Sequence, residues 1–392
     1  MQEAPMEPIH YIKQLFPKLI TLRRYLHQHP ELGFEEYNTN KFINKILSSL
    51  NEIEIIPQVA NTGVIAKINV NKQYKTLAFR ADIDALPIQD KKEVTYKSLY
   101  EGFSHSCGHD VHTTILLGTI LTLIKYKNQL RCNLIFIFQP AEEGPGGAKP
   151  ILEFIQPDQI DMILGLHVLP HLPTGYIAAS EGLSMGASTK ININLCGEAR
   201  HIAESTHDEN LIYLSSELLI LLKNAEKTFK ETHKDFLFSV GTINGGYYYN
   251  TTADEVTITG TIRSFSHQTN KSFFEYIKNN ITNSHLKTLI PKINIDFENM
   301  YPPLYNDNKA IQLIKASASK VLGTKNIVPA WKVLGADDFS FYTEKIKGGY
   351  FWLGTHKYGE IAYDLHSPYF DVDENCIFYG TLVLSQIALD YF

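Results

Sequence analysis

The sequence predicts an α/β protein in which a mainly parallel-sheet domain is interrupted by an inserted α+β domain. Three observations lead to this prediction. Up to about residue 186, apolar runs of strand length alternate with stretches of helical spacing. Between 187 and 299 the predicted order becomes β-α-β-β-α-β, the ferredoxin-like arrangement. From about residue 300 the first pattern returns. We therefore expect 1–186 and 300–392 to form one domain and 187–299 another.

The first part of the chain predicts helices on either side of short buried strands. Apolar residues recur at helical spacing over 38–50, and 111–126 is typical of a buried helix with Asp110 as its N-cap. Fully apolar runs of four to eight residues are typical of strands in a parallel sheet. The expected strands are 63–70, 76–80, 133–138 and 161–168.

The inserted part differs because its strands alternate polar and apolar residues, as in 190–195. Such alternation is typical of a strand with one exposed face. Its other expected elements are helices over 210–229 and 271–285 and strands over 236–243, 255–264 and 291–297. The last part predicts a helix over 310–322, a strand over 349–354 and a closing helix over 374–390.

Composition excludes several classes of protein. The net charge of −6 and the scattered lysines and arginines argue against a nucleic-acid partner. No apolar run is long enough to span a membrane, and Met1 to His10 lacks the features of a signal peptide. Four cysteines in 392 residues do not make a disulfide framework, so we expect a reducing, cytoplasmic setting. These are Cys107, Cys132, Cys196 and Cys376.

Polar side chains follow three of the predicted strands. Asp82 and Asp84 come after the second strand, Glu142 and Glu143 after the third, and His167 stands at the end of the fourth. Ligands of open α/β sheets bind outside the carboxyl ends of the strands. The sequence therefore predicts that these groups converge on one crevice.

Cys107 and His109 stand two residues apart just before a predicted helix, so one turn could direct both at one centre. Other interpretations stay open for this pair alone. It could be a buried thiol beside a hydrogen-bonded histidine, or a Cys–His nucleophile pair. It does not have zinc-finger spacing, because no second pair follows nearby.

Glu142 and Glu143 are adjacent carboxylates directly after an apolar strand, which is costly unless a cation compensates them. One could bind a metal while the other faces substrate, although a solvated loop is the simpler interpretation of the pair alone. The Gly-Pro-Gly-Gly that follows lacks the Lys-Ser/Thr of a P-loop. His366, in the sequence LHSP, is by itself more often structural than functional.

Taken together and in order, seven motifs resemble the M20 metallopeptidase/amidohydrolase family. They resemble its N-acyl-amino-acid amidohydrolase branch, with hippurate hydrolases, auxin-conjugate hydrolases and N-acetyldiaminopimelate deacetylases. The resemblance runs from about Leu22 to the C-terminus. The motifs are RRYLHQHPELGFEE, FRADIDALP, CGHDVH, QPAEEGPGGA, GLHV, GADDFS and DLHSP.

The resemblance implies two divalent metal ions per subunit. It makes Glu142 the general base and Asp84 a support of the metal site. Asp82 stands where the peptidase branches carry a histidine ligand. A mixed set of thiolate, imidazole and carboxylate suits Zn, Mn, Co or Ni better than Mg or Ca. The implied metal ligands are Cys107, His109, Glu143, His167 and His366.

For the inserted domain the resemblance implies a lid that also forms a homodimer. His201 would reach across that dimer to the substrate carbonyl, while Asn250 and Arg263 would bind the substrate carboxylate. The chain departs from the family here, because Ala199 and Arg200 replace two glycines that precede the histidine. Glycines give backbone freedom, so their loss bears on where His201 lies.

The function so implied is metal-dependent hydrolysis of the amide bond of N-acyl amino acids. The expected partner is thus a small-molecule substrate, and neither a nucleic acid nor a membrane is expected. A water shared by the two cations would lose a proton to Glu142, and His201 would stabilise the oxyanion. Three alternatives are a metallo-exopeptidase acting on dipeptides, a thiol hydrolase using Cys107, and a non-catalytic binding protein of the same fold.

Overall fold

The computed structural model describes residues 7–207 and 210–392. Residues 1–6 lie outside this description. They make up most of the segment from Met1 to His10, for which we expect no signal peptide. The chain forms two compact units. Unit 1 contains 1–182, 305–331 and 341–392, and unit 2 contains 183–304 and 332–340. The expected boundaries at 186/187 and 299/300 stay predictions of where the domains begin and end.

Among its described residues, unit 1 contains an eight-stranded mixed sheet. Its four central strands are parallel, whereas β1, β2 and β6 join it in antiparallel pairs. The mainly parallel sheet that we expected is thus parallel at its centre. The order is β1 (Glu54–Val59), β2 (Gly63–Ile68), β4 (Asn133–Gln139), β3 (Thr76–Asp82), β5 (Met162–Pro173), β14 (Gly348–His356), β6 (Ile177–Ala178) and β13 (Ile327–Val328).

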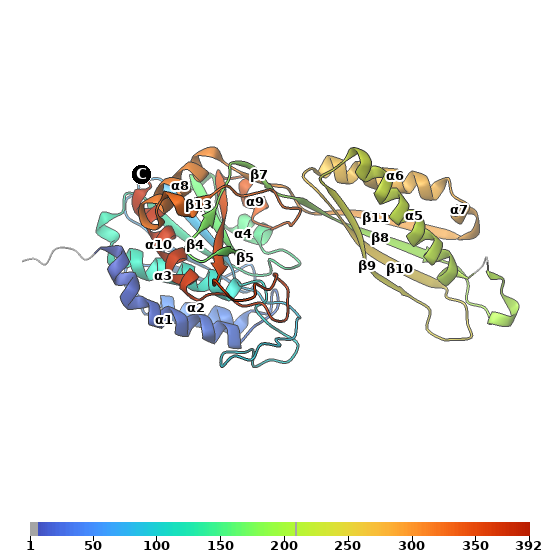
Figure 1. The fold of residues 1–392 in the computed structure, drawn as a ribbon, viewed down its shortest axis with the longest axis horizontal. Helices are drawn as coiled ribbons and strands as arrows, with labels where there is room; N and C mark the ends of the chain where they lie inside the picture. The colour runs from blue at the N-terminus through green and yellow to red at the C-terminus, as the bar shows by residue number, and fades with distance from the viewer. Residues whose placement is uncertain (1–6, 208–209) are drawn as a thin grey trace, which may run out of the picture. The chain divides into compact units, whose positions relative to one another are not determined.

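Four helices of unit 1 pack side by side (Figure 1). They are α1 (Pro8–Gln28), α3 (His109–Lys125), α8 (Asn308–Leu322) and α10 (Asn375–Asp390). Helix α3 is buried over its first fifteen residues, because it lies between the sheet and helices α1 and α10. The shorter helices α2 (Tyr37–Leu47) and α4 (Ala148–Phe154) pack against β1.

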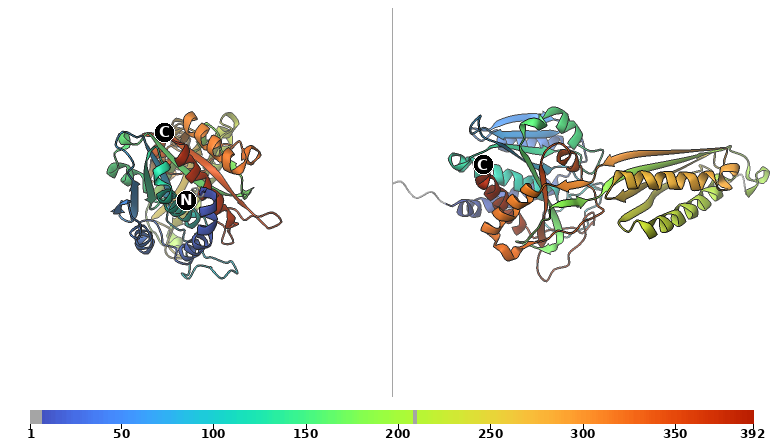
Figure 2. Two further views of the ribbon diagram at one scale, coloured as in Figure 1. Left: turned by 90° about the vertical axis from the view of Figure 1, so that its left-hand side faces the viewer. Right: turned by 90° about the horizontal axis from the view of Figure 1, so that it is seen from above.

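Unit 2 is a four-stranded antiparallel sheet with two long helices that pack on it side by side (Figures 1 and 2). The strands lie in the order β11-β8-β10-β9, and the apolar faces of helices and sheet form a core of their own. The elements are β8 (Ala187–Cys196), α5 (Leu211–Thr232), β9 (Phe236–Gly245), β10 (Glu255–Ser264), α6 (His267–Thr282), α7 (Leu286–Leu289) and β11 (Lys292–Tyr301).

Three short elements lie where the chain passes from one unit to the other. They are β7 (Gly182–Met185), β12 (Leu304–Asn306) and α9 (Ser340–Thr343). Within the described part of the chain, none of the helices combines the length and the apolar character needed to cross a membrane.

The predicted N-cap of helix α3 is wrong. The helix begins at His109, and the residue before it, Gly108, has the left-handed φ of 86°. Asp110 already lies in the first turn, fully buried, where its carboxylate accepts hydrogen bonds from Arg23 and His27. A side chain held by helix α1 in this way cannot cap its own helix.

Candidate metal centre

The predicted convergence of strand ends takes place in unit 1. Asp82, the last residue of β3, pairs with Gln139, the last residue of β4. His167 does not end its strand as predicted, because β5 continues to Pro173 through its pairing with β14. Arg80 pairs with Gly165, so two residues further along both strands His167 lies level with Asp82. Strand β5 therefore extends beyond its pairing with β3, and His167 lies at the same edge of the sheet as Asp82.

The turn before α3 brings Cys107 and His109 to this edge. A Cβ on Gly108 would lie 2.5 Å from Cγ2 of Val168, and the φ of 86° is one that residues with side chains rarely adopt. Only glycine fits this position without strain. The thiol of Cys107 lies 3.3 Å from Nε2 of His167, and the ligand atoms of Cys107, His109 and His167 lie within 4.8 Å of one another.

Asp84 orients two of the predicted ligands at once. Its Oδ1 accepts a hydrogen bond from Nδ1 of His109 at 3.0 Å, and its Oδ2 accepts one from the backbone N–H of Glu143 at 2.9 Å. The bond to Nδ1 leaves Nε2 of His109 unprotonated in the neutral ring and directed at the cluster. That nitrogen is buried, and in the described structure it has no hydrogen-bond partner.

Glu143 and His366 complete the set of expected ligands. Nε2 of His366 lies 3.1 Å from Oε1 of Glu143, and Cys107, Glu143 and His366 form a second group within 4.8 Å. The two groups share Cys107. His366 has a left-handed φ of 65° and donates its backbone N–H to the carbonyl of Ser106 at 2.8 Å. A non-glycine residue in this conformation is strained, and such strain is concentrated at functional sites.

Burial and charge set the proton affinities of the ligands. Burial raises the pKa of the Cys107 thiol well above its ordinary value, and the carboxylates of Glu143 and Glu142 add to this. Burial lowers the pKa of His167 to about 3, so that ring is neutral. Burial also opposes protonation of His109, but Asp82 and Asp84 outweigh it and raise its pKa to about 10. Metal binding must therefore release protons from Cys107 and His109.

These residues fit a divalent metal. A buried imidazole nitrogen without a hydrogen-bond partner among the described residues, a thiol and several carboxylates face one another, and buried carboxylates need a compensating cation. Thiolate and imidazole ligands select the transition metals rather than Mg or Ca. The donor chemistry thus agrees with the set expected from the sequence.

Sequence reasoning gave His112 no role, although it lies three residues after His109 on the same helix. Nδ1 of His112 donates to Oδ1 of Asp82 at 2.6 Å, and its Nε2 accepts the backbone N–H of Val168 at 3.0 Å. The carbonyl of Val168 in turn accepts Nδ1 of His167 at 2.8 Å. Asp82 is also paired with Arg80 at 2.6 Å. Asp82 and His112 are thus engaged in orienting His167.

The three residues expected to contact substrate lie in unit 2. The backbone N–H of Ile202 donates to the carbonyl of Asn250 at 3.1 Å, so His201 and Asn250 lie side by side. His201 is exposed, and its Nδ1 accepts the backbone N–H of Ala203 at 3.2 Å. Arg263 lies on β10, paired with Ser188 of β8. Arg200, which replaces a glycine, donates its backbone N–H to the hydroxyl of Thr252 at 2.8 Å and accepts the backbone N–H of Thr252 at 2.9 Å.

The fold and this donor set define a class of protein, the metal-dependent hydrolases. The chain belongs to peptidase family M20/M25/M40, whose model matches residues 78–390. It is 34% identical over 381 residues to the N-acetyl-L-cysteine deacetylase of Bacillus subtilis (strain 168), covering 96% of this chain and 89% of that one. The IAA-amino acid hydrolase ILR1-like 4 of Arabidopsis thaliana is 32% identical, with 96% and 86% covered.

Solved structures agree with this assignment. A putative aminohydrolase from methicillin-resistant Staphylococcus aureus has a TM-score of 0.84 at 27% identity, covering 99% of this chain and 100% of that one. The YXEP protein of Bacillus subtilis, described as a dinuclear metal-binding peptidase of the M20 family, has a TM-score of 0.76 at 30% identity, with 96% and 98% covered. The predicted family is confirmed, and so is the enzyme class, a hydrolase of linear amides.

A further carboxylate, Glu36, supports the loop that carries Glu142. It is fully buried, and its Oε1 accepts the backbone N–H of Ala141 at 2.9 Å while its Oε2 accepts the hydroxyl of Thr62. Ala141 has a left-handed φ of 54°, which this hydrogen bond helps to hold. Burial raises the pKa of Glu36 from 4.5 to about 7, although the Thr62 hydrogen bond opposes the shift.

This raised pKa predicts a specific pH dependence of stability. Stability contributed by Glu36 is fully present below about pH 4.5 and is lost as the pH rises through about 7. Between pH 5.5 and 8.5 the loss amounts to about 2 kcal/mol. We expect Glu36→Gln to abolish this pH dependence. Between pH 5.5 and 8.5, the free energy of unfolding of the metal-free variant should therefore rise by about 2 kcal/mol relative to that of wild type, as measured by denaturant unfolding. Glu35→Gln, at the exposed neighbour, serves as control. A difference between Glu36→Gln and wild type that stays constant with pH would contradict the prediction.

Proposed function

We propose that this protein hydrolyses the amide bond of N-acyl amino acids, with Glu142 as the general base. The observation that carries this proposal is a difference between the partners of two neighbouring carboxylates. Both group with His109, and Oε2 of Glu142 lies 4.0 Å from its Nε2, but only Glu143 also groups with Cys107 and His366. This difference supports Glu143 as a metal ligand and Glu142 as the residue that moves a proton.

The residues that would hold two divalent cations, such as zinc or manganese, are Cys107, His109, Glu143, His167 and His366. When bound, the cations supply Lewis acidity and lower the pKa of water. Glu142, of which 7% is exposed, takes a proton from the attacking water and returns it to the leaving amine nitrogen. Asp84 keeps His109 and the backbone of Glu143 in place during this exchange.

We further propose that unit 2 is a ferredoxin-like lid through which a cytoplasmic homodimer forms. His201 would stabilise the oxyanion, and Asn250 and Arg263 would bind the carboxylate of the amino acid. The exposed ring of His201 next to Asn250 supports this division of roles. The names of the relatives support small acylated amino acids as substrates. A fully active monomer in analytical ultracentrifugation would count against a role of His201 across a dimer.

The alternative of a thiol hydrolase finds no support in the surroundings of Cys107. Reactive thiols have a lowered pKa and are partly exposed. Cys107 is 6% exposed, and burial raises its pKa well above the ordinary value.

Metal removal tests the proposal. We expect dialysis against a chelator to reduce hydrolysis of N-acetyl, N-benzoyl and indoleacetyl amino acids to background, and Zn or Mn to restore it. Product amine is measured, with a series of unblocked dipeptides as the matched substrates. Faster turnover of the dipeptides would favour an exopeptidase. Hydrolysis that survives the chelator but stops on thiol alkylation would favour the Cys107 nucleophile.

A further inference from the structure

A group of charged side chains, all buried except the partly exposed Asp371, lies behind the candidate centre, where helix α1 meets helix α3. We call Arg23, His27, Lys92, Asp110 and Asp371 the Arg23 network. The guanidinium of Arg23 has no exposed surface. Its Nε donates to Oδ2 of Asp110 at 2.8 Å, and its Nη2 donates to Oδ1 of Asp371 at 3.2 Å. One cation thus joins carboxylates from two distant parts of the chain.

His27 and Lys92 extend the network. Nδ1 of His27 lies 2.7 Å from Oδ2 of Asp110, and Nζ of Lys92 lies 2.8 Å from Nε2 of the same ring. An ammonium can only donate, so in the neutral ring Nε2 accepts from Lys92 and the proton stands on Nδ1, facing Asp110, while Oδ2 of Asp90 also lies 3.4 Å from Nε2. Lys92 also donates to the carbonyl of Phe370 at 2.7 Å. Two cations and a histidine therefore fix Asp110 and the segment around Phe370 to each other.

Both segments so joined carry predicted metal ligands. Asp110 follows His109 in the first turn of α3. Phe370 and Asp371 lie four and five residues after His366, whose backbone N–H is bonded to Ser106 beside Cys107. The network thus connects the turn of Cys107 and His109 to the segment of His366 on the side away from the ligands.

Stability alone is a poor reason for such a network. Burying charges costs several kcal/mol per ion, and buried ion pairs replaced by packed apolar groups often leave a fold equally stable. What hydrogen-bonded charges supply is a fixed geometry. The arginine fork between Asp110 and Asp371 fixes a distance and an orientation that apolar side chains would not specify.

We propose that the Arg23 network is a positioning device for metal binding, which holds the Cys107–His109 turn and His366 at the separation that two cations require. The inference rests on the proposed metal centre and goes beyond it, because none of the five residues is itself a ligand. It also gives a role to Arg23 and His27, which belong to the motif RRYLHQHPELGFEE.

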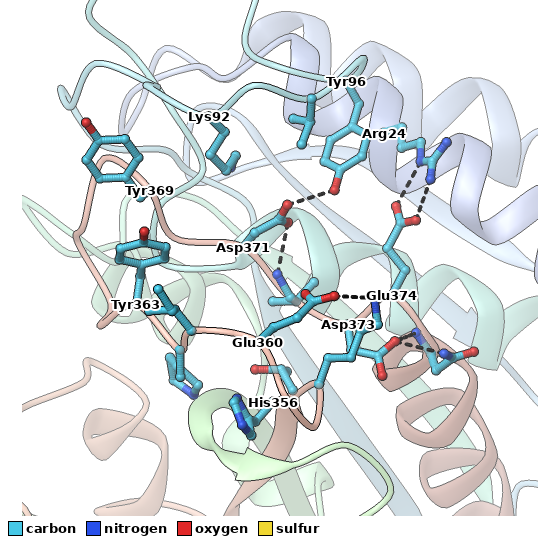
Figure 3. Close-up of a pocket in the computed structure, with 18 of the residues that line it drawn as sticks. Arg24, Lys92, Tyr96, His356, Glu360, Tyr363, Tyr369, Asp371, Asp373 and Glu374 are labelled. Carbon is cyan, nitrogen blue, oxygen red and sulfur yellow. Dashed lines mark hydrogen bonds and ion pairs between the residues drawn. The ribbon is translucent and has the colours of Figure 1, made fainter.

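Arg24, the next residue on α1, offers a matched control. Its side chain is 43% exposed and forms a two-pronged pair with Glu374, at 3.0 and 2.6 Å (Figure 3). Tyr96 donates to Asp371 at 2.7 Å, and both residues line the pocket drawn in Figure 3. Arg24 has the same charge, lies on the same helix and shares Glu374 with Arg23, whose Nη1 lies 3.4 Å from Oε1 of that carboxylate, but among the described interactions it makes no contact with Asp110 or His27.

The test measures metal affinity of the full chain rather than turnover. Metal-free Arg23→Met and Arg24→Met proteins are titrated with Zn and with Mn against a chromophoric chelator, at a temperature where circular dichroism shows both folded. We expect Arg23→Met to weaken binding at least about tenfold, the effect of losing a partner behind the ligands. For Arg24→Met we expect a change of less than about twofold, as for an exposed ion pair.

A second variant covers the case in which Arg23→Met does not fold. Burial lowers the pKa of Lys92, so an uncharged side chain is tolerated there more easily. We expect Lys92→Met to weaken metal binding several-fold through loss of the Phe370 contact. Folded network variants that bind as tightly as wild type would overturn the inference, as would an equal loss in the Arg24→Met control. Wild-type protein that binds neither metal would instead refute the proposed function.

Discussion

Replacing Glu142 by glutamine is expected to lower kcat by about 10²–10⁴-fold and to leave metal content unchanged. Glutamine has the shape of glutamate but cannot accept the proton of the attacking water. The five predicted ligands, and Asp84 behind them, are untouched by this change. Turnover of an N-acyl amino acid under saturation, together with elemental analysis of the same sample, measures both quantities.

Glu143→Gln is the matched control because the two residues are neighbours in one loop. Glu143 is paired with His366 at 3.1 Å and belongs to the group of ligands, so its loss should weaken metal binding first. At metal concentrations high enough to refill the site, part of the activity of Glu143→Gln should return, whereas that of Glu142→Gln should not. If Glu142→Gln lost metal as Glu143→Gln does, the division of roles would be wrong.

Gly108→Ala is expected to reduce the free energy of unfolding by about 2–5 kcal/mol and to weaken metal binding. The left-handed φ of 86° costs a residue with a side chain about 1–2 kcal/mol. A methyl group 2.5 Å from Cγ2 of Val168 adds about 1–3 kcal/mol of crowding. Relief requires Val168 to move, and its backbone is bonded to both His112 and His167. The strain is therefore passed directly to a predicted ligand.

Gly102→Ala separates the two causes. Gly102 has a similar φ of 81°, but a Cβ there would meet no atom within 4 Å. We expect it to cost only the backbone contribution, about 1–2 kcal/mol, and to leave metal affinity unchanged. Denaturant unfolding gives the first comparison and chelator competition the second. Equal losses in the two variants would mean that contact with Val168 carries no energy.

Much of the fold could be predicted because burial dictates the sequence pattern of its elements. Strand β4 is expected over 133–138 and observed over Asn133–Gln139, since a strand covered on both faces must be apolar throughout. Strand β10 has the expected bounds, Glu255–Ser264, because one face of its sheet is covered by helices and the other is not. Helix α1 was not predicted, although Ile12, Leu15, Leu19, Leu22 and Leu26 repeat at helical spacing.

The candidate site could be predicted in part for a similar reason. Asp82 and the Glu142–Glu143 pair follow apolar strands, and parallel strands end at one edge, so their approach follows from the sequence alone. The interpretations of Cys107, His109 and His366 stayed open until the family resemblance was considered. Their spacing follows neither the helical nor the strand period, so it does not predict which of them lie close together. Family membership is confirmed, while the roles of the individual residues stay predictions.

By itself, the sequence of this protein determined which segments are buried and where most of its strands and helices lie. These properties depend on local pattern and on the cost of burying polar groups. Only the tertiary structure decided that β5 outruns β3 and so places His167 level with Asp82. It also decided that Asp110 is bound to Arg23 rather than capping α3. Both depend on contacts between residues 80 or more positions apart, and no local pattern encodes which distant partner a side chain meets.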